Sequence, residues 1–182
     1  MKKFEEKTIQ SKVLYKGKVI TLQVDEVLLP DGNKSSREIV KHPGAVAIMA
    51  ITEDKKIILV EQYRKALERS IIEIPAGKIE PGEPQEETAR RELEEETGYT
   101  TSSLQYVQSF ATSPGFADEV IHLYFAENIE KMSIKATLDE DEFVEVLYVT
   151  IEEMESLVTN NKIYDAKTAF ACLWLKDYMK KM

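Results

Sequence analysis

The densest group of chemically capable side chains in this sequence consists of carboxylates. From Glu80 to Glu96 there are eight glutamates and two arginines, so this stretch has a formal charge of -6 in a chain whose net charge is -9. On a helix, Glu92 and Glu96 lie one above the other beside the apolar face, and Glu95 lies on the other flank of Glu92. The spacing therefore predicts three carboxylates next to the buried edge of one helix.

This acidic cluster has two interpretations. Most runs of glutamate are the solvated side of a helix, and Glu87 and Glu94 are predicted to point to solvent in that way. Like charges four residues apart repel by a few tenths of a kcal/mol even on an open surface, and the cost rises beside a core. A hard cation with oxygen ligands removes that cost. Glu92, Glu95 and Glu96 therefore predict a site for Mg²⁺, with Mn²⁺ as a substitute.

A helix must hold these carboxylates, and strands must support it. Residues 83–97 are predicted to be helical because they are rich in Glu, Arg, Ala and Leu, and Gly98 follows as the C-cap. Further helices are predicted at 151–158 and from 166 onward. We expect a single α+β domain, a mixed sheet sandwiched between helices. Apolar runs or alternation predict strands at 20–25, 37–41, 45–51, 57–61, 71–74, 104–110, 120–126 and 143–149.

Turn chemistry and helical spacing add two local predictions. Pro30 to Asn33 is typical of a turn between the first two of these strands. In the last helix, an apolar stripe at i, i+3, i+4, i+7 and i+8 predicts the face that packs on the core. That stripe consists of Ala166, Ala169, Phe170, Leu173 and Trp174.

The acidic stretch resembles a known signature. Gly77, five residues, Glu83, seven residues and then Arg91 through Gly98 is similar to the Nudix box of the Nudix hydrolases. Every fixed position matches, and only Tyr99 is aromatic where the family has an aliphatic residue. The resemblance extends from about residue 37 to the last helix. It implies the Nudix fold, with the box as a loop-helix-loop in one domain spanning 1–182.

The resemblance also assigns metal ligands by position. It implies that Glu92 and Glu96 bind the metal directly and that Glu95 is a further or water-mediated ligand. The backbone carbonyl of Ala76, just before the box glycine, is another implied ligand. Outside the box, Glu142 is the implied ligand from a second loop.

Two more box residues have implied supporting roles. Arg91 is expected to orient Glu95 rather than to touch substrate. Glu83 is expected to be structural, paired with Arg90 or Arg91.

Three features outside the box resemble the ADP-ribose pyrophosphatase subgroup. Pro114 in Ser113-Pro114-Gly115 follows Gly98 by 16 residues, although an ordinary turn has the same composition. Arg64 ends the segment Glu-Gln-Tyr-Arg, where the subgroup's arginine contacts substrate; the alternative is an arginine in solvent. The third feature is the acidic run at 139–142.

That acidic run is either a solvated loop or the subgroup's mobile catalytic loop. The resemblance implies Glu140 as the general base and Glu142 as the metal ligand, with a register that could shift by one or two residues; Glu95 is the next candidate base. A pyrophosphate repels hydroxide, and divalent cations neutralise it and lower the pKa of a bound water. A carboxylate then takes the proton, and loop closure excludes bulk water.

The expected reaction is Mg²⁺-dependent hydrolysis of ADP-ribose to AMP and ribose 5-phosphate. Arg37 and Arg64 offer guanidinium forks for phosphate. Glu119 is expected to contact a ribose hydroxyl or the metal. The full set of expected substrate-binding residues is Arg37, Glu38, Arg64, Lys78, Ser113, Pro114, Gly115 and Glu119.

Composition limits the remaining possibilities. With 182 residues, 43% hydrophobic and 31% charged, the chain is expected to form one globular domain. No apolar run approaches the roughly 20 residues of a membrane span, and the first residues lack the apolar region of a secretory signal. The acidic balance disfavours nucleic acid as a partner. A single cysteine, Cys172, fits a reducing cytoplasm.

Other functions stay open from the sequence alone. Another nucleoside diphosphate sugar is the closest alternative substrate. A sensor that binds ADP-ribose without cleaving it is the alternative from another class, but such modules usually have a decayed box and an attached effector domain. A plain acidic cation-binding protein is a weaker alternative. The subgroup resemblance also implies a homodimer, with the strands of residues 1–40 at the interface.

Overall fold

The computed structural model describes residues 3–134 and 143–181. Glu140 and Glu142 lie outside these ranges. The chain divides into two compact units. The hairpin unit comprises Met1–Gly44 and Phe110–Ile121, and the main unit comprises Ala45–Ser109 and His122–Met182.

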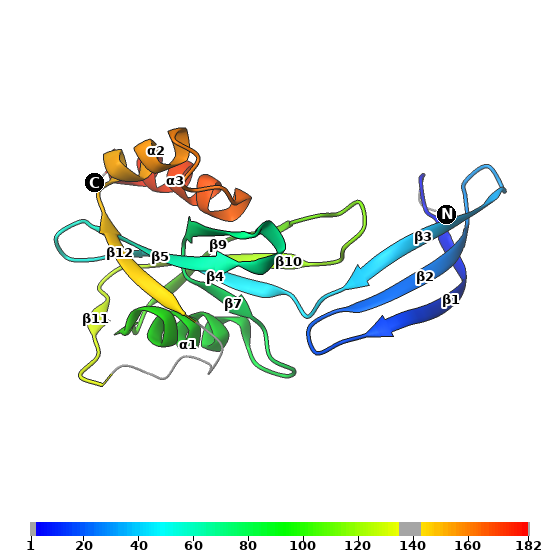
Figure 1. The fold of residues 1–182 in the computed structure, drawn as a ribbon, viewed down its shortest axis with the longest axis horizontal. Coiled ribbons are helices and arrows are strands. Elements are labelled where there is room, and N and C mark those ends of the chain that lie inside the picture. Colours follow the sequence, from blue (N-terminus) through cyan, green and yellow to red (C-terminus); the bar gives the residue numbers. More distant parts are fainter. Residues whose placement is uncertain (1–2, 135–142, 182) are drawn as a thin grey trace. The chain divides into compact units, whose positions relative to one another are not determined.

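The hairpin unit contains a three-stranded antiparallel sheet in the order β1-β2-β3 (Figure 1). Its strands are β1 Lys7–Lys16, β2 Thr21–Leu28 and β3 Lys34–Lys41. The predicted turn between β2 and β3 is confirmed, with Gly32 at φ 87° and the Asn33 amide donating to Asp31 Oδ1 at 3.0 Å. Both flanking strands were predicted, whereas β1 has no clear alternation and is exposed along its whole length.

The main unit is built on a mixed sheet whose strand order is β12-β5-β4-β10-β9. Two short strands join it, since β6 pairs with β5 and β7 pairs with β4. The hairpin of β4 and β5 is the centre of the core, and the apolar side chains of β4 are almost completely buried. Bounds are β4 Ala45–Ile51, β5 Ile57–Arg64, β6 Arg69–Glu73, β7 Ala76–Lys78, β9 Leu104–Ala111, β10 Val120–Ala126 and β12 Val144–Val149.

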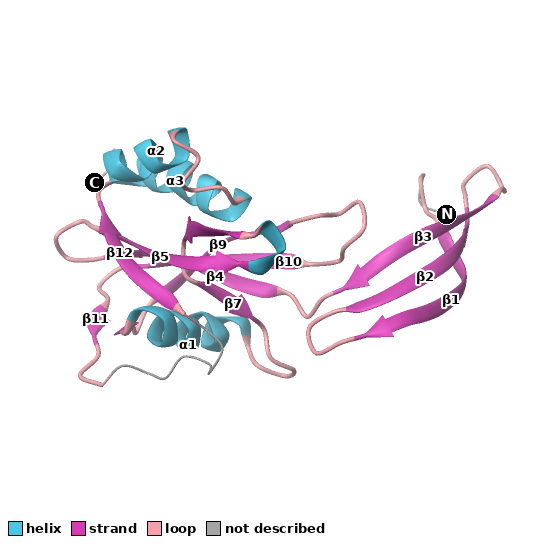
Figure 2. Ribbon diagram, in the orientation of Figure 1, coloured by secondary structure: helices cyan, strands magenta, loops and turns pink. Residues whose placement is uncertain are grey.

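Helices cover both faces of this sheet, as the sequence predicted (Figure 2). Helix α1, Gln85–Thr97, lies on one side, and α2, Ile151–Thr159, and α3, Ala166–Met179, lie on the other. Gly98 ends α1 at φ 74° as predicted. A short helix and a two-stranded pair complete the described elements: η1 Lys65–Leu67, β8 Tyr99–Thr100 and β11 Glu130–Lys131. No helix in the described ranges has the length and apolar character needed to cross a membrane.

The predicted buried face of α3 is wrong. Leu173 is 71% exposed, and the side of α3 that packs inward consists of Thr168, Ala171, Cys172 and Leu175. Apolar residues surround the helix axis here, so spacing alone does not select one stripe. Polar contacts select it instead, because the buried Thr168 hydroxyl accepts the amide of Ile74 at 3.0 Å. Trp174 is half-buried and packs against Phe125, with ring centroids 5.0 Å apart.

Candidate active site

The acidic helix packs directly against the backbone of β7. The Ala76 amide donates to Glu96 Oε2 at 3.0 Å, and Glu96 is only 3% exposed. A Cβ atom on Gly77 would lie 1.9 Å from Cδ of Glu92, so only glycine lets that carboxylate approach the strand. Two buried carboxylates and the Ala76–Gly77 backbone are thus brought together, as the resemblance implied.

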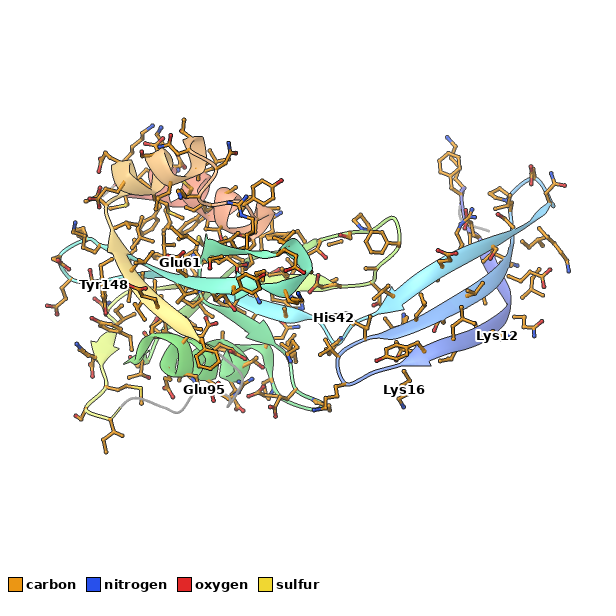
Figure 3. All side chains as sticks on the ribbon, viewed as in Figure 1. Lys12, Lys16, His42, Glu61, Glu95 and Tyr148 are labelled. Carbon is orange, nitrogen blue, oxygen red and sulfur yellow. The ribbon has the colours of Figure 1, made fainter. Side chains whose placement is uncertain are left out.

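Arg91 links the carboxylates of this cluster. Its Nη1 donates to Glu92 Oε1 at 2.9 Å and to Glu95 Oε2 at 3.0 Å. Its Nε and Nη2 donate to the two oxygens of Glu83, both at 3.0 Å. The expected contacts of Arg91 with Glu95 and with Glu83 are therefore confirmed. Figure 3 labels Glu95, which lies in the last turn of α1.

Glu83 and Arg91 form an ion pair that shifts the pKa of both groups. The Arg91 hydrogen bonds lower the pKa of Glu83 to about 2, and the Thr88 hydroxyl, which donates to Glu83 at 2.8 Å, acts in the same direction. Glu83 in turn is the main cause of the raised pKa of Arg91. The loop before α1 is thereby tied to the guanidinium that holds Glu92 and Glu95.

We expect Glu83→Gln to destabilise the fold in a pH-dependent way. Because the folded pKa of about 2 lies below the ordinary 4.5, the ionised carboxylate stabilises the folded state fully above pH 4.5 and progressively less as pH falls towards 2. At neutral pH the free energy of unfolding of the wild-type chain should be about 2 kcal/mol larger than that of the variant. Urea unfolding of both proteins between pH 2 and 7 measures this difference in the free energy of unfolding. A difference that stays constant on acidification would contradict the stabilising role of the ionised Glu83.

One of the two solvent-facing assignments on α1 is wrong. Glu94 is half-buried and accepts the Thr100 hydroxyl at 2.6 Å, because the chain turns back after Gly98 and brings β8 beside the helix end. Glu87 is exposed, as predicted.

The donor chemistry of this cluster fits a hard divalent cation. Carboxylates and a backbone carbonyl are the oxygen ligands that Mg²⁺ takes, and Gly77 keeps the space beside Glu92 clear of a side chain. In the described ranges no three His, Cys, Asp or Glu side chains are grouped closely enough to form a metal centre by themselves. Arg91 Nη1 pairs with both Glu92 and Glu95.

A second group of expected site residues belongs to the hairpin unit. The Ser113 carbonyl accepts the amides of Phe116 and Ala117 at 3.1 and 2.9 Å, so Ser113-Pro114-Gly115 forms a hydrogen-bonded turn. Glu119 accepts the Thr112 hydroxyl at 2.5 Å, and its other oxygen lies 3.5 Å from His42 Nδ1. The loop from 112 to 119 is thereby fixed to the end of β3.

Some of the other expected substrate-binding side chains already bond to protein groups, and others do not lie buried. Arg37 is bound at both Nε and Nη2 by Glu6, at 2.8 and 2.6 Å, and its Nη1 donates to Ser35. A substrate phosphate would have to compete with that bidentate pair. Glu38 and Lys78 are exposed, and Lys78 sits at the end of β7 next to the acidic cluster.

Arg64 lies at the end of β5 as predicted, but it is not simply in solvent. Its Nε donates to Glu73 Oε2 at 2.6 Å, and the side chain is 39% exposed. Within the described ranges the two Nη atoms make no hydrogen bond. The guanidinium is therefore held at Nε, and its two Nη atoms can donate to a ligand.

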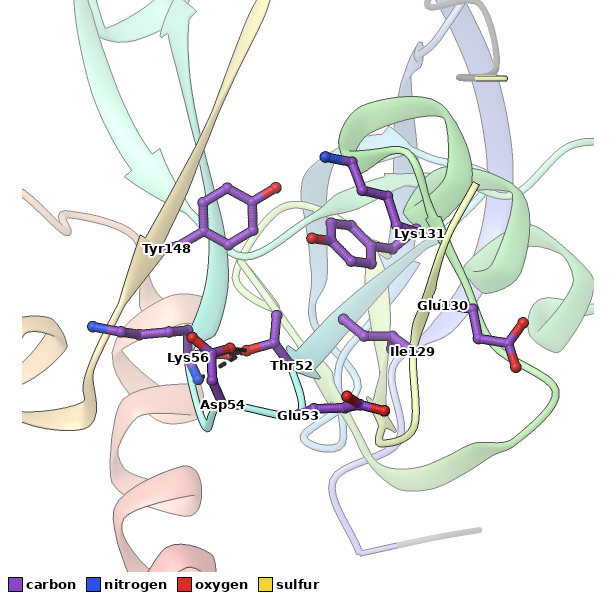
Figure 4. A pocket seen from close by; sticks show the side chains of 9 residues that line it. Thr52, Glu53, Asp54, Lys56, Ile129, Glu130, Lys131 and Tyr148 are labelled. Atoms are coloured by element: carbon purple, nitrogen blue, oxygen red, sulfur yellow. Dashed lines mark hydrogen bonds between the residues drawn. The ribbon is translucent and has the colours of Figure 1, made fainter. Parts of the chain in front are cut away.

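Of two surface pockets, one is lined by the segment that precedes Arg64 and the other is lined by none of the expected site residues. One of about 590 Å³ is lined by the predicted Glu61-Gln62-Tyr63 segment and by the start of β12. The other, about 580 Å³, is lined by Lys56, Lys131 and the paired rings of Tyr99 and Tyr148 (Figure 4). Burial and the contact with Tyr99 raise the pKa of Tyr148 to about 12. None of the expected site residues lines this second pocket.

The sequence did not identify Glu73 as the partner of Arg64, nor Lys167 as the second partner of Glu73. Glu73 is 3% exposed and Lys167 is 8% exposed, and they pair at 2.5 Å between β6 and α3. The available signal was a single glutamate inside the apolar run Ile71-Ile72-Glu73-Ile74. A buried charge in such a strand requires a partner of opposite charge, but the sequence does not say which one.

Comparisons with known proteins agree with this arrangement. A family model described as NUDIX domain matches residues 40–170, and one described as nucleoside diphosphate sugar hydrolase N-terminal domain matches residues 6–40. An ADP-ribose pyrophosphatase of Bacillus subtilis (strain 168) is 57% identical over 97% of this chain and 95% of that protein. A methanol dehydrogenase activator of Bacillus methanolicus is 55% identical over 96% and 95%.

A solved structure supports the fold independently of close sequence similarity. The crystal structure of an ADP compounds hydrolase superposes with a TM-score of 0.83 at 20% identity, covering 97% of this chain and 95% of that chain. The sheet between α1 and the pair α2–α3 is thus a known architecture. With the intact box on α1 and a family match across most of its length, the chain belongs to the Nudix family of hydrolases.

Proposed function

We propose that the chain is a Mg²⁺-dependent enzyme that hydrolyses the pyrophosphate bond of ADP-ribose to AMP and ribose 5-phosphate. The observation that carries the proposal is the cluster in which Glu92 and Glu96 pack on the Ala76–Gly77 backbone while Arg91 holds Glu92 and Glu95. The relative at 57% identity, named an ADP-ribose pyrophosphatase, supports the substrate.

Each part of the cluster has a task in this reaction. Glu92, Glu95, Glu96 and the Ala76 carbonyl are the proposed metal ligands, together with Glu142. When bound, Mg²⁺ supplies charge neutralisation of the pyrophosphate and a more acidic water. Arg91 fixes the orientation of two glutamates. Glu140 is the proposed base that takes the proton from the attacking water.

Substrate binding is proposed to rest mainly on the anchored arginine of β5. The Nη atoms of Arg64 suit two oxygens of a phosphate. The turn at Ser113 to Gly115 and the carboxylate of Glu119 are proposed to contact the remainder of the substrate, with Arg37, Glu38 and Lys78.

We also propose a homodimer in which residues 1–40 lie at the interface and the chain acts as one Nudix domain. All of β1 is exposed in a single protomer, including Ile9, Val13, Leu14 and Tyr15, which are each about half exposed or more. β1 is also an edge strand of its sheet, and an exposed edge strand that carries apolar side chains favours pairing with another chain. A cytoplasmic location is proposed from the single cysteine.

A substrate panel tests the proposed reaction against its alternatives. The purified chain is assayed for AMP or other nucleoside monophosphate release from ADP-ribose and from ADP- and GDP-hexoses, with Mg²⁺ and after chelation. We expect the largest kcat/KM for ADP-ribose. A larger value for a hexose derivative would replace the substrate, and binding of ADP-ribose without turnover would favour the sensor.

A second candidate function comes from the relative named methanol dehydrogenase activator, which is 55% identical over nearly the whole chain. Two relatives of almost equal identity thus have different names. Adding this chain to a purified methanol dehydrogenase and measuring the change in the kcat of that dehydrogenase tests this function separately from pyrophosphate hydrolysis.

We expect Arg64→Ala to weaken substrate binding more than it slows chemistry. Loss of a charge-assisted hydrogen bond costs about 1.5–3 kcal/mol, so KM for ADP-ribose should rise about 10- to 100-fold. Arg64→Lys should recover only part of the loss, because an ammonium group lacks the planar fork. Steady-state kinetics of both variants measure this, and an unchanged KM in both would remove Arg64 from the site.

A further inference from the structure

Arg64 belongs to a chain of charges that runs from β5 through β6 to α3. Glu73 uses one carboxylate oxygen for Arg64 Nε, at 2.6 Å, and the other for Lys167 Nζ, at 2.5 Å. Lys167 Nζ is also 2.9 Å from Asp165 Oδ2. Two cations and two carboxylates therefore alternate, and their formal charges cancel.

The start of α3 holds this chain in place and also reaches the acidic cluster. Asp165 is the N-cap of α3 and accepts the Thr168 amide at 3.1 Å. The Thr168 hydroxyl accepts the amide of Ile74, which directly follows Glu73. Ala76, two residues further on, donates its amide to Glu96. The same short segment thus connects the helix start, Glu73 and the proposed metal ligands.

The charges of nearby carboxylates act on the guanidinium of Arg64. Burial lowers the pKa of Arg64, but the hydrogen bond that Arg64 donates to Glu73 and the charges of Glu73, Glu96 and Asp165 outweigh burial and raise it. The negative charges of Glu73, Glu96 and Asp165 therefore keep the guanidinium of Arg64 protonated. Glu73 is the one of these carboxylates that bonds to it directly.

We propose that Glu73 is a positioning residue for substrate binding: held by Lys167, it grips Arg64 at Nε and leaves both Nη atoms directed to the phosphates of a nucleoside diphosphate. This proposal rests on the proposed function, since it deepens the role of Arg64 there. Fixing one edge of a guanidinium lowers the entropy lost when the other edge binds phosphate. Without Glu73 the long Arg64 side chain samples many rotamers, and binding weakens.

The alternative is that the Glu73–Lys167 pair only joins α3 to the sheet. Breaking such a buried pair from one side is strongly destabilising, whereas removing both charges is often neutral. Glu73→Gln leaves Lys167 with Asp165 as a partner, and Glu73→Gln combined with Lys167→Met removes both charges. At least one of these two proteins is expected to fold normally, as checked by thermal melts.

A double-mutant cycle with Arg64 separates the two roles. In the wild-type background we expect Glu73→Gln, alone or with Lys167→Met, to raise KM roughly five- to tenfold while kcat changes by less than about twofold. In an Arg64→Ala background the same changes should leave KM within about twofold, because the grip acts only through Arg64. Lys176→Met is the matched control, since its pair with Glu155 joins α3 to α2 and does not lead to Arg64; its KM should be that of wild type.

The outcomes distinguish this proposal from the proposed function. The cycle is run on whichever nucleoside diphosphate derivative the wild-type chain hydrolyses best, so a substrate other than ADP-ribose overturns only the proposed substrate. Effects of Glu73→Gln and Arg64→Ala on KM that simply multiply would overturn the positioning role. So would an unchanged KM in a folded Glu73 variant, or a loss confined to kcat.

Discussion

Replacing Glu96 by glutamine is expected to lower kcat by on the order of 10²–10³-fold, while the fold stays close to normal. Glu96 is 3% exposed and sits against the Ala76 amide within the carboxylate cluster. Glutamine has nearly the same shape as glutamate and can still accept that amide hydrogen, but the substitution removes one negative charge from the proposed ligand set. Measuring kcat against Mg²⁺ concentration, together with thermal melts, tests this prediction.

Glu87→Gln is the matched control on the same helix. Glu87 is exposed on the side of α1 away from the cluster, so its kcat should match that of wild type. Glu94→Gln is a poorer control because Glu94 accepts a hydrogen bond from Thr100. A Glu96→Gln enzyme with near-wild-type kcat at moderate Mg²⁺ would remove Glu96 from the ligand set.

Replacing Glu140 by glutamine is expected to lower kcat by about 10²–10⁴-fold with little change in KM, because proton transfer is realised in the transition state. Glu140 lies outside the described residues, so this prediction comes from the sequence and the family resemblance. A pH profile adds a second readout, since loss of the base should remove the acidic limb of kcat.

Glu142→Gln serves as the comparison within the same acidic run. If Glu142 is a metal ligand, raised Mg²⁺ should restore part of the activity of this variant, whereas it should not restore that of Glu140→Gln. Small and equal effects of both substitutions would mean that the acidic run is a solvated loop. Glu95 would then be the base to test next.

The sequence was sufficient to predict the acidic helix and its orientation. Ala89 and Leu93 define a buried face that packs against strands β4 and β5, and this places Glu92 and Glu96 at its edge. Glycine at 98 ended the helix for the expected reason, a left-handed backbone conformation. These features depend on the spacing of residues along one helix, and that spacing can be read directly from the sequence.

Contacts between distant elements could not be predicted in this way. The pairs Glu73–Lys167 and Glu6–Arg37 join residues that are far apart in the chain. Their charges are visible in the sequence, but their partners depend on how strands and helices pack. The face of α3 was misassigned for the same reason, since the hydrogen bond from Ile74 to Thr168 decides which side turns inward.

The proposed reaction requires the carboxylate cluster on α1, Mg²⁺ and ADP-ribose together. The most direct measurement is product analysis of ADP-ribose incubated with the wild-type chain and with its Glu96→Gln variant, each with Mg²⁺ and after chelation. We expect equimolar AMP and ribose 5-phosphate from the wild type with Mg²⁺, and little product in the other three reactions. Intact ADP-ribose in every reaction, or equal product from both proteins, would contradict it.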